Sequence, residues 1–151
     1  MINGEIRNPI RLLQFQRVCD KYNIEMKLSQ PLTYNNGWMS GLLDSDGSIY
    51  FNISSSQLFI TIANNNKCLL DLLIPLYGGS IYLTNSSGLS FKWLVFKKEE
   101  LLNLLNYFKV CSLYSTKLHR IQLIPHYFEL RKIKAHLKSP ETIEGKLWIN
   151  F

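Results

Sequence analysis

Hydrophobic and polar positions divide the chain into short segments with two different periods. Residues 9–22 carry apolar side chains at helical spacing, with Asn8 as a candidate N-cap and Pro9 at the first helical position. Residues 48–54 instead alternate, with Ser48, Tyr50, Asn52 and Ser54 on one side and isoleucine or phenylalanine on the other. This alternation is typical of a strand with one buried face in an antiparallel sheet.

The rest of the chain continues this alternation of helical and extended segments. Glycines at 78–79 and the sequence Ser-Ser-Gly at 86–88 predict turns. Two hairpins with helices between them predict an α+β domain, with an antiparallel sheet that has helices on one face and a polar, open second face. The further predicted elements are a helix at 36–44, a strand at 57–63, a helix at 66–77, strands at 80–84 and 89–96, a helix at 97–110 and a helical region at 115–137 interrupted near Pro125.

Composition narrows the class of protein only modestly. The 151 residues, 46% hydrophobic, suffice for one domain with a core. A net charge of +6 is compatible with a polyanionic partner such as nucleic acid, and equally with a basic protein that has none. Three widely spaced cysteines predict no disulfide framework and fit a reducing compartment, and the three histidines lack metal-ligand spacing. We expect no signal peptide and no membrane span, since no apolar stretch approaches about 18 residues.

The predicted helix at 36–44 carries an unusual set of small residues. Gly37, Ser40, Gly41 and Asp44 follow spacings of three and four, which predicts a shared stripe on the helix. Such a stripe lets another backbone approach closely, as documented between membrane helices. The alternative interpretation is a flexible helix end, because a glycine inside a helix costs about 1 kcal/mol relative to alanine.

Two acids follow at the end of this helix, in the sequence Asp-Ser-Asp-Gly from Asp44 to Gly47. They could belong to a tight turn or to a metal site. An EF-hand calcium loop is excluded, because it requires glycine at its sixth position and glutamate at its twelfth. Here the glycine is fourth and the twelfth position is Ser55.

The nine residues from Met39 to Gly47, M-S-G-L-L-D-S-D-G, resemble the signature of the LAGLIDADG family of homing endonucleases and intron maturases, with Ser45 in place of alanine. The resemblance extends over nearly the whole chain. The segment LIPLYGGSIY is similar to the family's turn from a helix into the third strand, and STKLHRIQLI to its C-terminal S-x-K-x-x-R segment. The segment INGEIRNPIRLLQF is similar to the stretch that joins the halves of two-motif proteins encoded in fungal mitochondrial introns.

The resemblance implies an αββαββα core whose saddle-shaped sheet lies in the major groove of DNA, with the signature helices of two units packed together. It implies that Asp46, with the backbone carbonyl of Ser45, holds Mg²⁺ or Mn²⁺ beside the scissile phosphate, as suits oxygen ligands. By the same analogy Asp44 hydrogen-bonds the partner helix, Lys117 offsets charge on the phosphate, and Asn64 positions water. From the residues alone, the alternatives are that Lys117 is a surface lysine, Asn64 a turn former and Asp46 a turn residue.

The polar face of the sheet is the predicted nucleic-acid surface. Hydroxyl and amide groups read base edges, while lysine and arginine contact phosphates. The alternative is a merely solvated face. The predicted contact residues are Ser48, Tyr50, Asn52, Ser54, Thr61, Ser80, Tyr82, Thr84 and Lys92.

The chain departs from a complete family member because it holds one motif, whereas a cleavage site needs two acids. It would therefore act as a symmetric homodimer, or as a C-terminal half whose partner is a first-half polypeptide. We expect residues 1–30 to be a linker-like helix and loop and residues 31–151 to be a single LAGLIDADG domain. Two functions follow from the resemblance, both mitochondrial. One is a metal-dependent, sequence-specific DNA endonuclease. The other is a non-cleaving RNA-binding protein, namely a group I intron maturase or a component of a mitochondrial ribonucleoprotein such as the ribosome.

Overall fold

The computed structural model describes residues 3–84 and 90–151, so the turn predicted at 86–88 lies outside the described residues. Helices and strands alternate in the predicted order. The elements are α1 (Pro9–Tyr22), α2 (Trp38–Asp46), β1 (Gly47–Asn52), β2 (Gln57–Asn64), α3 (Lys67–Asp71), α4 (Ile74–Tyr77), β3 (Ser80–Leu83), β4 (Phe91–Val95), α5 (Lys98–Val110), α6 (Lys117–Gln122), α7 (Ile124–Lys132), the 3₁₀ helix η1 (Ala135–Leu137) and α8 (Ile143–Ile149).

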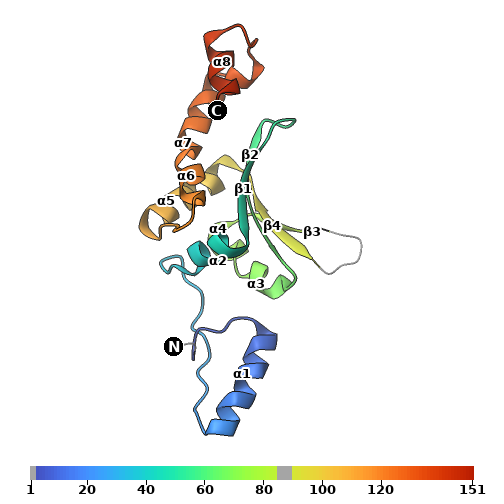
Figure 1. Ribbon diagram of the computed structural model, residues 1–151, viewed down its shortest axis with the longest axis vertical. Coiled ribbons are helices and arrows are strands. Elements are labelled where there is room, and N and C mark those ends of the chain that lie inside the picture. Colours follow the sequence, from blue (N-terminus) through green and yellow to red (C-terminus); the bar gives the residue numbers. More distant parts are fainter. Residues whose placement is uncertain (1–2, 85–89) are drawn as a thin grey trace.

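The four strands form one antiparallel sheet in the order β1-β2-β4-β3. Helices α2, α5 and α6 lie along one face of this sheet, while α7 and α8 extend beyond the β1–β2 turn (Figure 1). The register pairs Ile49 with Ile60 and Ile60 with Val95, which places these three buried side chains on the helix-covered face. The predicted α+β architecture is therefore confirmed.

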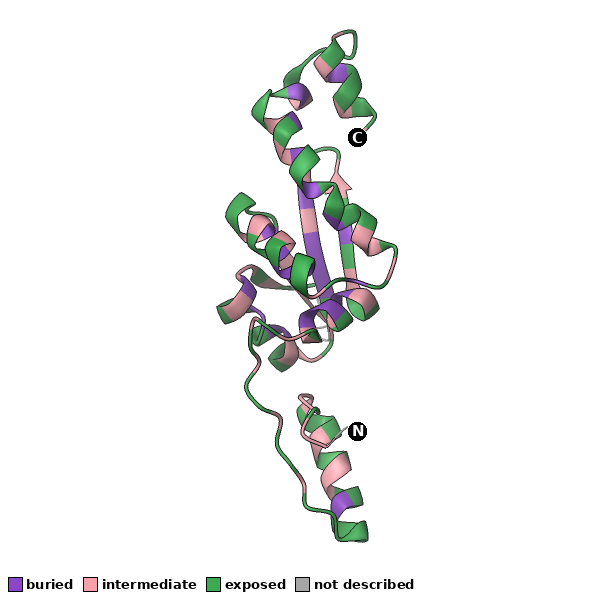
Figure 2. Cartoon of the chain, turned by 90° about the vertical axis from the view of Figure 1, so that its left-hand side faces the viewer, coloured by how far each residue is buried: buried purple, intermediate pink, exposed green. Residues whose placement is uncertain are grey.

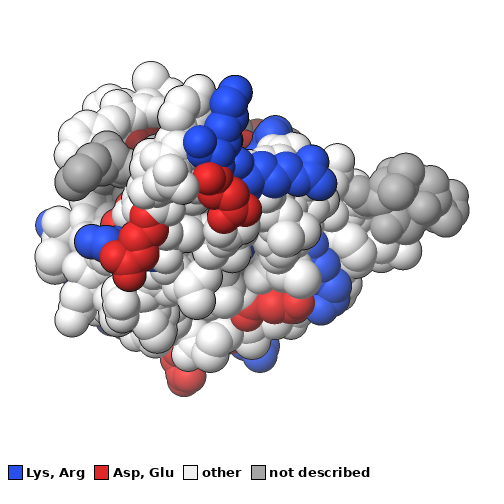
Figure 3. All heavy atoms as spheres, turned by 90° about the horizontal axis from the view of Figure 1, so that it is seen from below, with Lys and Arg blue, Asp and Glu red and all other residues white. Residues whose placement is uncertain are grey.

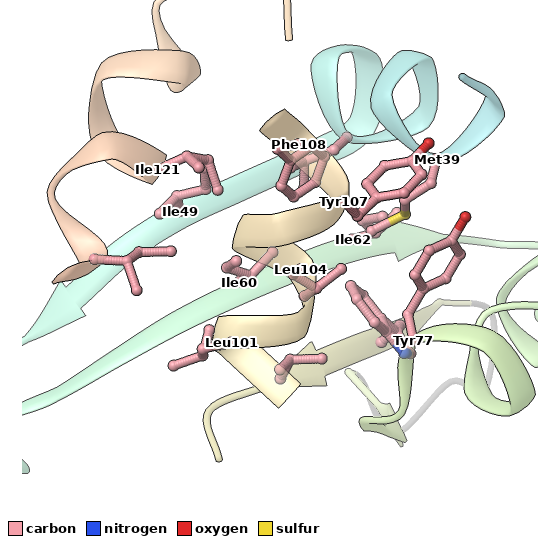
Figure 4. Close-up of a cluster of buried hydrophobic side chains, with 14 of the residues drawn as sticks. Met39, Ile49, Ile60, Ile62, Tyr77, Leu101, Leu104, Tyr107, Phe108 and Ile121 are labelled. Carbon is pink, nitrogen blue, oxygen red and sulfur yellow. The ribbon is translucent and has the colours of Figure 1, made fainter. Parts of the chain in front are cut away.

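The core lies between the sheet and its helices (Figure 4). Met39 and Leu43 of α2 pack there with Leu104 and Phe108 of α5 and with the fully buried Trp93 of β4. The burial of these residues follows from helical spacing on α2 and α5 and from period two on the strands. Each buried side chain of this size contributes about 1.5–3 kcal/mol. Helix α2 therefore has one face, with Met39 and Leu43, that packs in the core and an opposite face that does not.

The helices depart from the predicted boundaries in two places. The helix predicted at 66–77 is two short helices, because Pro75 lies in the first turn of α4 and cannot donate a backbone N–H. The predicted interruption of the region 115–137 near Pro125 is confirmed, since α6 ends at Gln122 and α7 begins at Ile124. Helix α2 continues to Asp46, two residues beyond the predicted end. Helix α8 was not predicted; Thr142 caps it by accepting a hydrogen bond from the Gly145 N–H.

The N-terminal segment lies apart from the sheet. Asn8 caps α1 as predicted, but Cys19 is the only buried residue of that helix, and Ile10 and Leu13 on it are exposed (Figure 2). Arg7 connects the segment to the rest, because its guanidinium lies 5.7 Å from the ring centroid of Trp38. The division at residues 30 and 31 stays a prediction. Within the described residues, no helix has the length and apolar character needed to cross a membrane.

Candidate functional site

The junction between α2 and β1 fixes the position of Asp46. Helix α2 ends at Asp46 and β1 begins at Gly47 with no intervening loop. A Cβ atom on Gly47 would lie 2.6 Å from the Leu43 carbonyl oxygen and 2.3 Å from the Leu43 Cδ1 atom. Only glycine allows the strand to leave the helix at this angle, so the carboxylate of Asp46 stands exposed at a tightly constrained corner.

Asn64, at the end of β2, lies beside this carboxylate. Its side-chain amide donates a hydrogen bond to Oδ2 of Asp46 over 3.2 Å, and its Oδ1 accepts one from the Asn66 N–H over 2.8 Å. Asn64 therefore is a turn former and a partner of Asp46 at the same time. The two alternatives that the sequence left open for Asn64 are not exclusive, and the sheet brings together two residues that are 18 positions apart.

Lys117 reaches the same corner from the start of α6. Its Nζ donates to the carbonyl oxygens of Leu43 at 2.8 Å and Asp44 at 2.7 Å, the last turn of α2. A cation at this end of a helix meets the negative end of the helix dipole and donates to the carbonyls of the last turn. The alternative of a plain surface lysine is therefore wrong. Lys117 provides the compensating charge that two carboxylates near a helix C-terminus require.

Asp44 turns toward its own chain. Its carboxylate accepts hydrogen bonds from the Tyr114 N–H at 2.7 Å and the Ser115 hydroxyl at 2.5 Å, so it caps the loop that leads into α6. Burial raises the pKa of this carboxyl, but the bonds from Ser115 and Tyr114 outweigh burial. With the nearby charge of Lys117 they hold the pKa below its ordinary value. The expected bond to a partner helix does not account for these contacts, because they occupy the carboxylate within the chain.

The small-residue stripe divides into two faces. Ser40 is only 4% exposed, and its hydroxyl donates to the Cys111 carbonyl, so its role as an exposed interface residue is wrong. Gly37 and Gly41 are exposed, and a Cβ on either would meet no atom within 4 Å. The reason is helical geometry: at about 100° per residue, position 40 lies about 60° from position 37 but also about 60° from the buried Leu43, so it falls at the edge of the stripe that turns into the core. The exposed side of α2 thus combines Gly37 and Gly41 with the half-buried Trp38.

The second face of the sheet, opposite the helices, is uncovered and is called the open face below. Ser48, Ser80, Tyr82 and Thr84 are exposed there, and Lys92 is half-buried. Among the described residues the open face consists of Ser48, Tyr50, Asn52, Gln57, Phe59, Thr61, Ala63, Ser80, Tyr82, Thr84, Ser90, Lys92, Leu94 and Phe96.

The structure does not place two of the predicted nucleic-acid-binding residues, Thr61 and Ser54, on the accessible part of the open face. Thr61 is 4% exposed, because it lies on a central strand between Ser48 and Leu94, which are its cross-strand partners. Ser54 lies beyond the end of β1, in the turn, where its hydroxyl donates to the Asn52 side chain at 2.7 Å. The sequence did not reveal Phe59 and Phe96 as outward-facing, because both lie in predicted strands, 57–63 and 89–96, that are largely apolar on both faces, so that period two does not show which side chains face outward.

Charge is sparse on the open face. Lys92 is the only charged residue among the described residues that form it. At the α1 end of the molecule, Lys and Arg are interspersed with Asp and Glu and form no continuous basic patch (Figure 3). The described residues also contain no group of three or more His, Cys, Asp or Glu side chains arranged to hold a metal ion. The chain therefore brings one carboxylate, one amide and one ammonium group to one corner, at the end of a nearly neutral sheet face.

This arrangement of a helix that ends in an acid on an antiparallel sheet agrees with comparisons to known proteins. A family described as LAGLIDADG endonuclease matches residues 39–128, more than half of the chain. The chain belongs to this family. As a family member it is 34% identical over 158 residues to the intron-encoded DNA endonuclease ai2b of Dictyostelium discoideum, and 33% identical over 155 residues to the intron-encoded RNA maturase bI4 of Saccharomyces cerevisiae.

These relatives are much longer than this chain. Each match covers 99% of this chain but only 60% of the Dictyostelium protein and 24% of the yeast maturase. The fold is shared with the LAGLIDADG homing endonuclease I-GzeII, solved in complex with its DNA target, at a TM-score of 0.63 and 18% identity, over 89% of this chain and 50% of that one. It is also shared with the homing endonuclease I-TnaI, at a TM-score of 0.57 and 16% identity, over 72% of this chain and 80% of that one.

Proposed function

We propose that this chain supplies one half of a sequence-specific DNA endonuclease that depends on Mg²⁺ or Mn²⁺. The observation that carries the proposal is the convergence of Asp46, Asn64 and Lys117 at the end of α2, where the helix meets the open sheet face. Each comes from a different element, and none is needed for the packing of the core. A carboxylate, an amide and an ammonium group placed together are suited to a phosphodiester and a cation.

The donor set fits a hard divalent cation. Asp46 is exposed, and the hydrogen bond from Asn64 engages only its Oδ2 atom, so Asp46 with the Ser45 carbonyl would hold the ion through oxygen. The bound ion would activate water and stabilise charge on the phosphoryl oxygens. Asn64 orients the carboxylate. Lys117 has a third N–H beyond the two that it donates to α2, and that N–H can face a phosphate oxygen.

A second unit must complete the site, because Asp44 is engaged by Tyr114 and Ser115, and Asp46 is then the single acid that one chain offers for an ion at this corner. The exposed side of helix α2 is the surface that supports this assembly. Gly37 and Gly41 leave room for the backbone of another helix, and Trp38 supplies apolar area beside them. The partner is a second copy of the chain or a first-half polypeptide. The relatives are longer than this chain, so each could hold a second, different unit beside the matched one. This favours a first-half polypeptide as the partner over a second copy.

One comparison favours a second candidate function. The yeast relative is named an RNA maturase, at 33% identity over 99% of this chain. In that function the chain, with its net charge of +6, would bind structured intron RNA, and Asp46 would not be used for cleavage. The names of the relatives describe intron-encoded proteins, which supports action in the mitochondrion for either function, as part of a ribonucleoprotein in the second.

Strand scission tests the proposal. The purified chain, alone and mixed with a candidate first-half polypeptide, is incubated with a duplex DNA library in Mg²⁺ or Mn²⁺. Asp46→Asn is expected to abolish cleavage while leaving DNA binding within a few fold. Asp20→Asn, an exposed aspartate on α1, is the matched control and should leave both unchanged. If no mixture containing the wild-type chain nicks DNA in either metal, while intron RNA binds, the maturase function replaces the endonuclease.

A further inference from the structure

The open face of the sheet is organised in rows that run across the strands, because paired residues of neighbouring strands lie side by side. Nearest to Asp46 is a row with Ala63, Lys92 and Tyr82. At the far end Asn52 pairs with Gln57. Between these lies the aromatic row, which consists of Tyr50, Phe59 and Phe96. The ring centroids of Tyr50 and Phe59 are 5.4 Å apart in a stacked arrangement, and those of Phe59 and Phe96 are 5.8 Å apart.

The aromatic row is accessible from outside. Tyr50 and Phe96 are each 38% exposed, and Phe59 between them is half-buried. Three adjoining rings on an uncovered sheet face do not serve the core, which lies on the other side of the strands. A surface of this kind needs an apolar partner, because exposed contiguous apolar area is costly.

The chemistry of the outer rows matches one kind of base pair. Within the major groove, the C5 methyl of thymine is the apolar feature that aromatic and aliphatic side chains contact, and Asn or Gln amides pair with adenine. Guanine is read mainly by Arg or Lys. Among the described residues of the open face only Lys92 can do so, and it lies in the row nearest to Asp46. Arg120 lines a hollow with Tyr50, and Lys98, Arg131 and Lys132 line another with Gln57 and Phe96, but these four side chains belong to helices and not to the strands of the open face. The aromatic row and the Asn52–Gln57 pair therefore present a surface for A·T base pairs.

Strand geometry sets the position of this surface on the duplex. Four strands span about 14 Å, close to the roughly 12 Å width of the major groove, so the strands must run along the groove. Phe59 is four residues from Ala63 on β2, which is about 13 Å. At about 3.4 Å per base pair along the duplex axis, the aromatic row then lies at most about four base pairs outward from the row of Lys92.

We propose that the aromatic row of Tyr50, Phe59 and Phe96 reads the C5 methyl groups of thymine, so that the outer part of the DNA half-site is restricted to A·T pairs. This inference rests on the proposed DNA-binding function, but it concerns sequence choice and not cleavage. Lys92 can contact guanine, so G·C pairs are accepted near the scissile phosphate. The half-site should therefore change from mixed sequence near the cleavage position to A·T pairs in its outer part.

Binding selection followed by methyl removal tests the inference. The full chain first selects a half-site from a randomised duplex DNA library, without metal. Deoxyuridine, which lacks the methyl, then replaces thymine in the outer or the inner part of that site. Each contacted methyl is expected to contribute about fourfold in affinity, the equivalent of one buried methylene. The outer replacement should weaken wild-type binding. This uracil effect should shrink in Phe59→Ala, which leaves Tyr50 and Phe96 in place, and Phe59→Leu should retain it in full.

Controls separate the possible outcomes. Tyr22→Ala removes an exposed aromatic ring on α1, away from the sheet, and should leave the uracil effect unchanged. Circular dichroism confirms that each variant is folded. A half-site without A·T pairs in its outer part, or a uracil effect that is undiminished in Phe59→Ala, overturns the inference even if the chain cleaves DNA. Selection of an A·T half-site by a chain that never cleaves upholds the inference while the endonuclease proposal fails. Selection of RNA in preference to any duplex overturns both.

Discussion

Lys117→Met removes a capping charge while keeping most of the volume of the side chain. The ammonium group donates to two carbonyls in the last turn of α2, at 2.8 and 2.7 Å. A hydrogen bond from a charged donor contributes about 1.5–3 kcal/mol, and a cation at a partly buried helix C-terminus up to about 2 kcal/mol. The Leu43 carbonyl retains a second donor, the Gly47 N–H, so the loss falls mainly on the carbonyl of Asp44.

We therefore expect Lys117→Met to lower the free energy of unfolding by about 2–3 kcal/mol, which corresponds to a fall in Tm of about 5–10 °C for a domain of this size. Urea unfolding followed by far-UV circular dichroism measures the change. The control is Lys138→Met, which removes an exposed lysine after η1 and should change stability by less than about 0.5 kcal/mol.

Equal stability of the two variants would refute the capping role. If Lys117→Met also lost cleavage without losing stability, Lys117 would act on the phosphate alone. A loss of both, with Lys117→Arg recovering stability, is the result that the contacts predict, because arginine keeps the charge at the helix end.

Two further predictions concern the other residues of α2. Hydrogen bonds hold the pKa of the Asp44 carboxyl below its ordinary value, so its stabilising effect is complete at neutral pH and is lost as the pH falls through the folded-state pKa. The stability difference between wild type and Asp44→Asn should therefore shrink below about pH 4 in urea unfolding, and an undiminished difference in acid would contradict the assignment. Gly41→Ala should stabilise the isolated chain by about 1 kcal/mol, because its Cβ meets open space, yet weaken association with a second unit in sedimentation; unchanged association would remove α2 from the interface.

The sequence by itself determined the local elements and the identity of the acid. Asn8 followed by Pro9 marked the start of α1, the change from period 3.6 to period 2 marked the junction at Gly47, and both hairpins followed from alternation and turn residues. These signals are local, since capping, backbone dihedral preference and side-chain alternation act over a few neighbouring residues. The match to the LAGLIDADG signature was also readable, because it depends on nine consecutive residues.

Only the tertiary structure decided what those residues contact. Ser40 and Gly41 are neighbours in sequence, yet one is buried against α5 and the other faces outward, and the direction of the core selects between them. The pairing of Asp46 with Asn64 and of Lys117 with the end of α2 joins positions 18 and more than 70 residues apart. The register of β2 alone placed Phe59 on the open face. Such long-range choices depend on how whole elements pack, because many registers and rotations satisfy the same local pattern and only one buries all the apolar faces together.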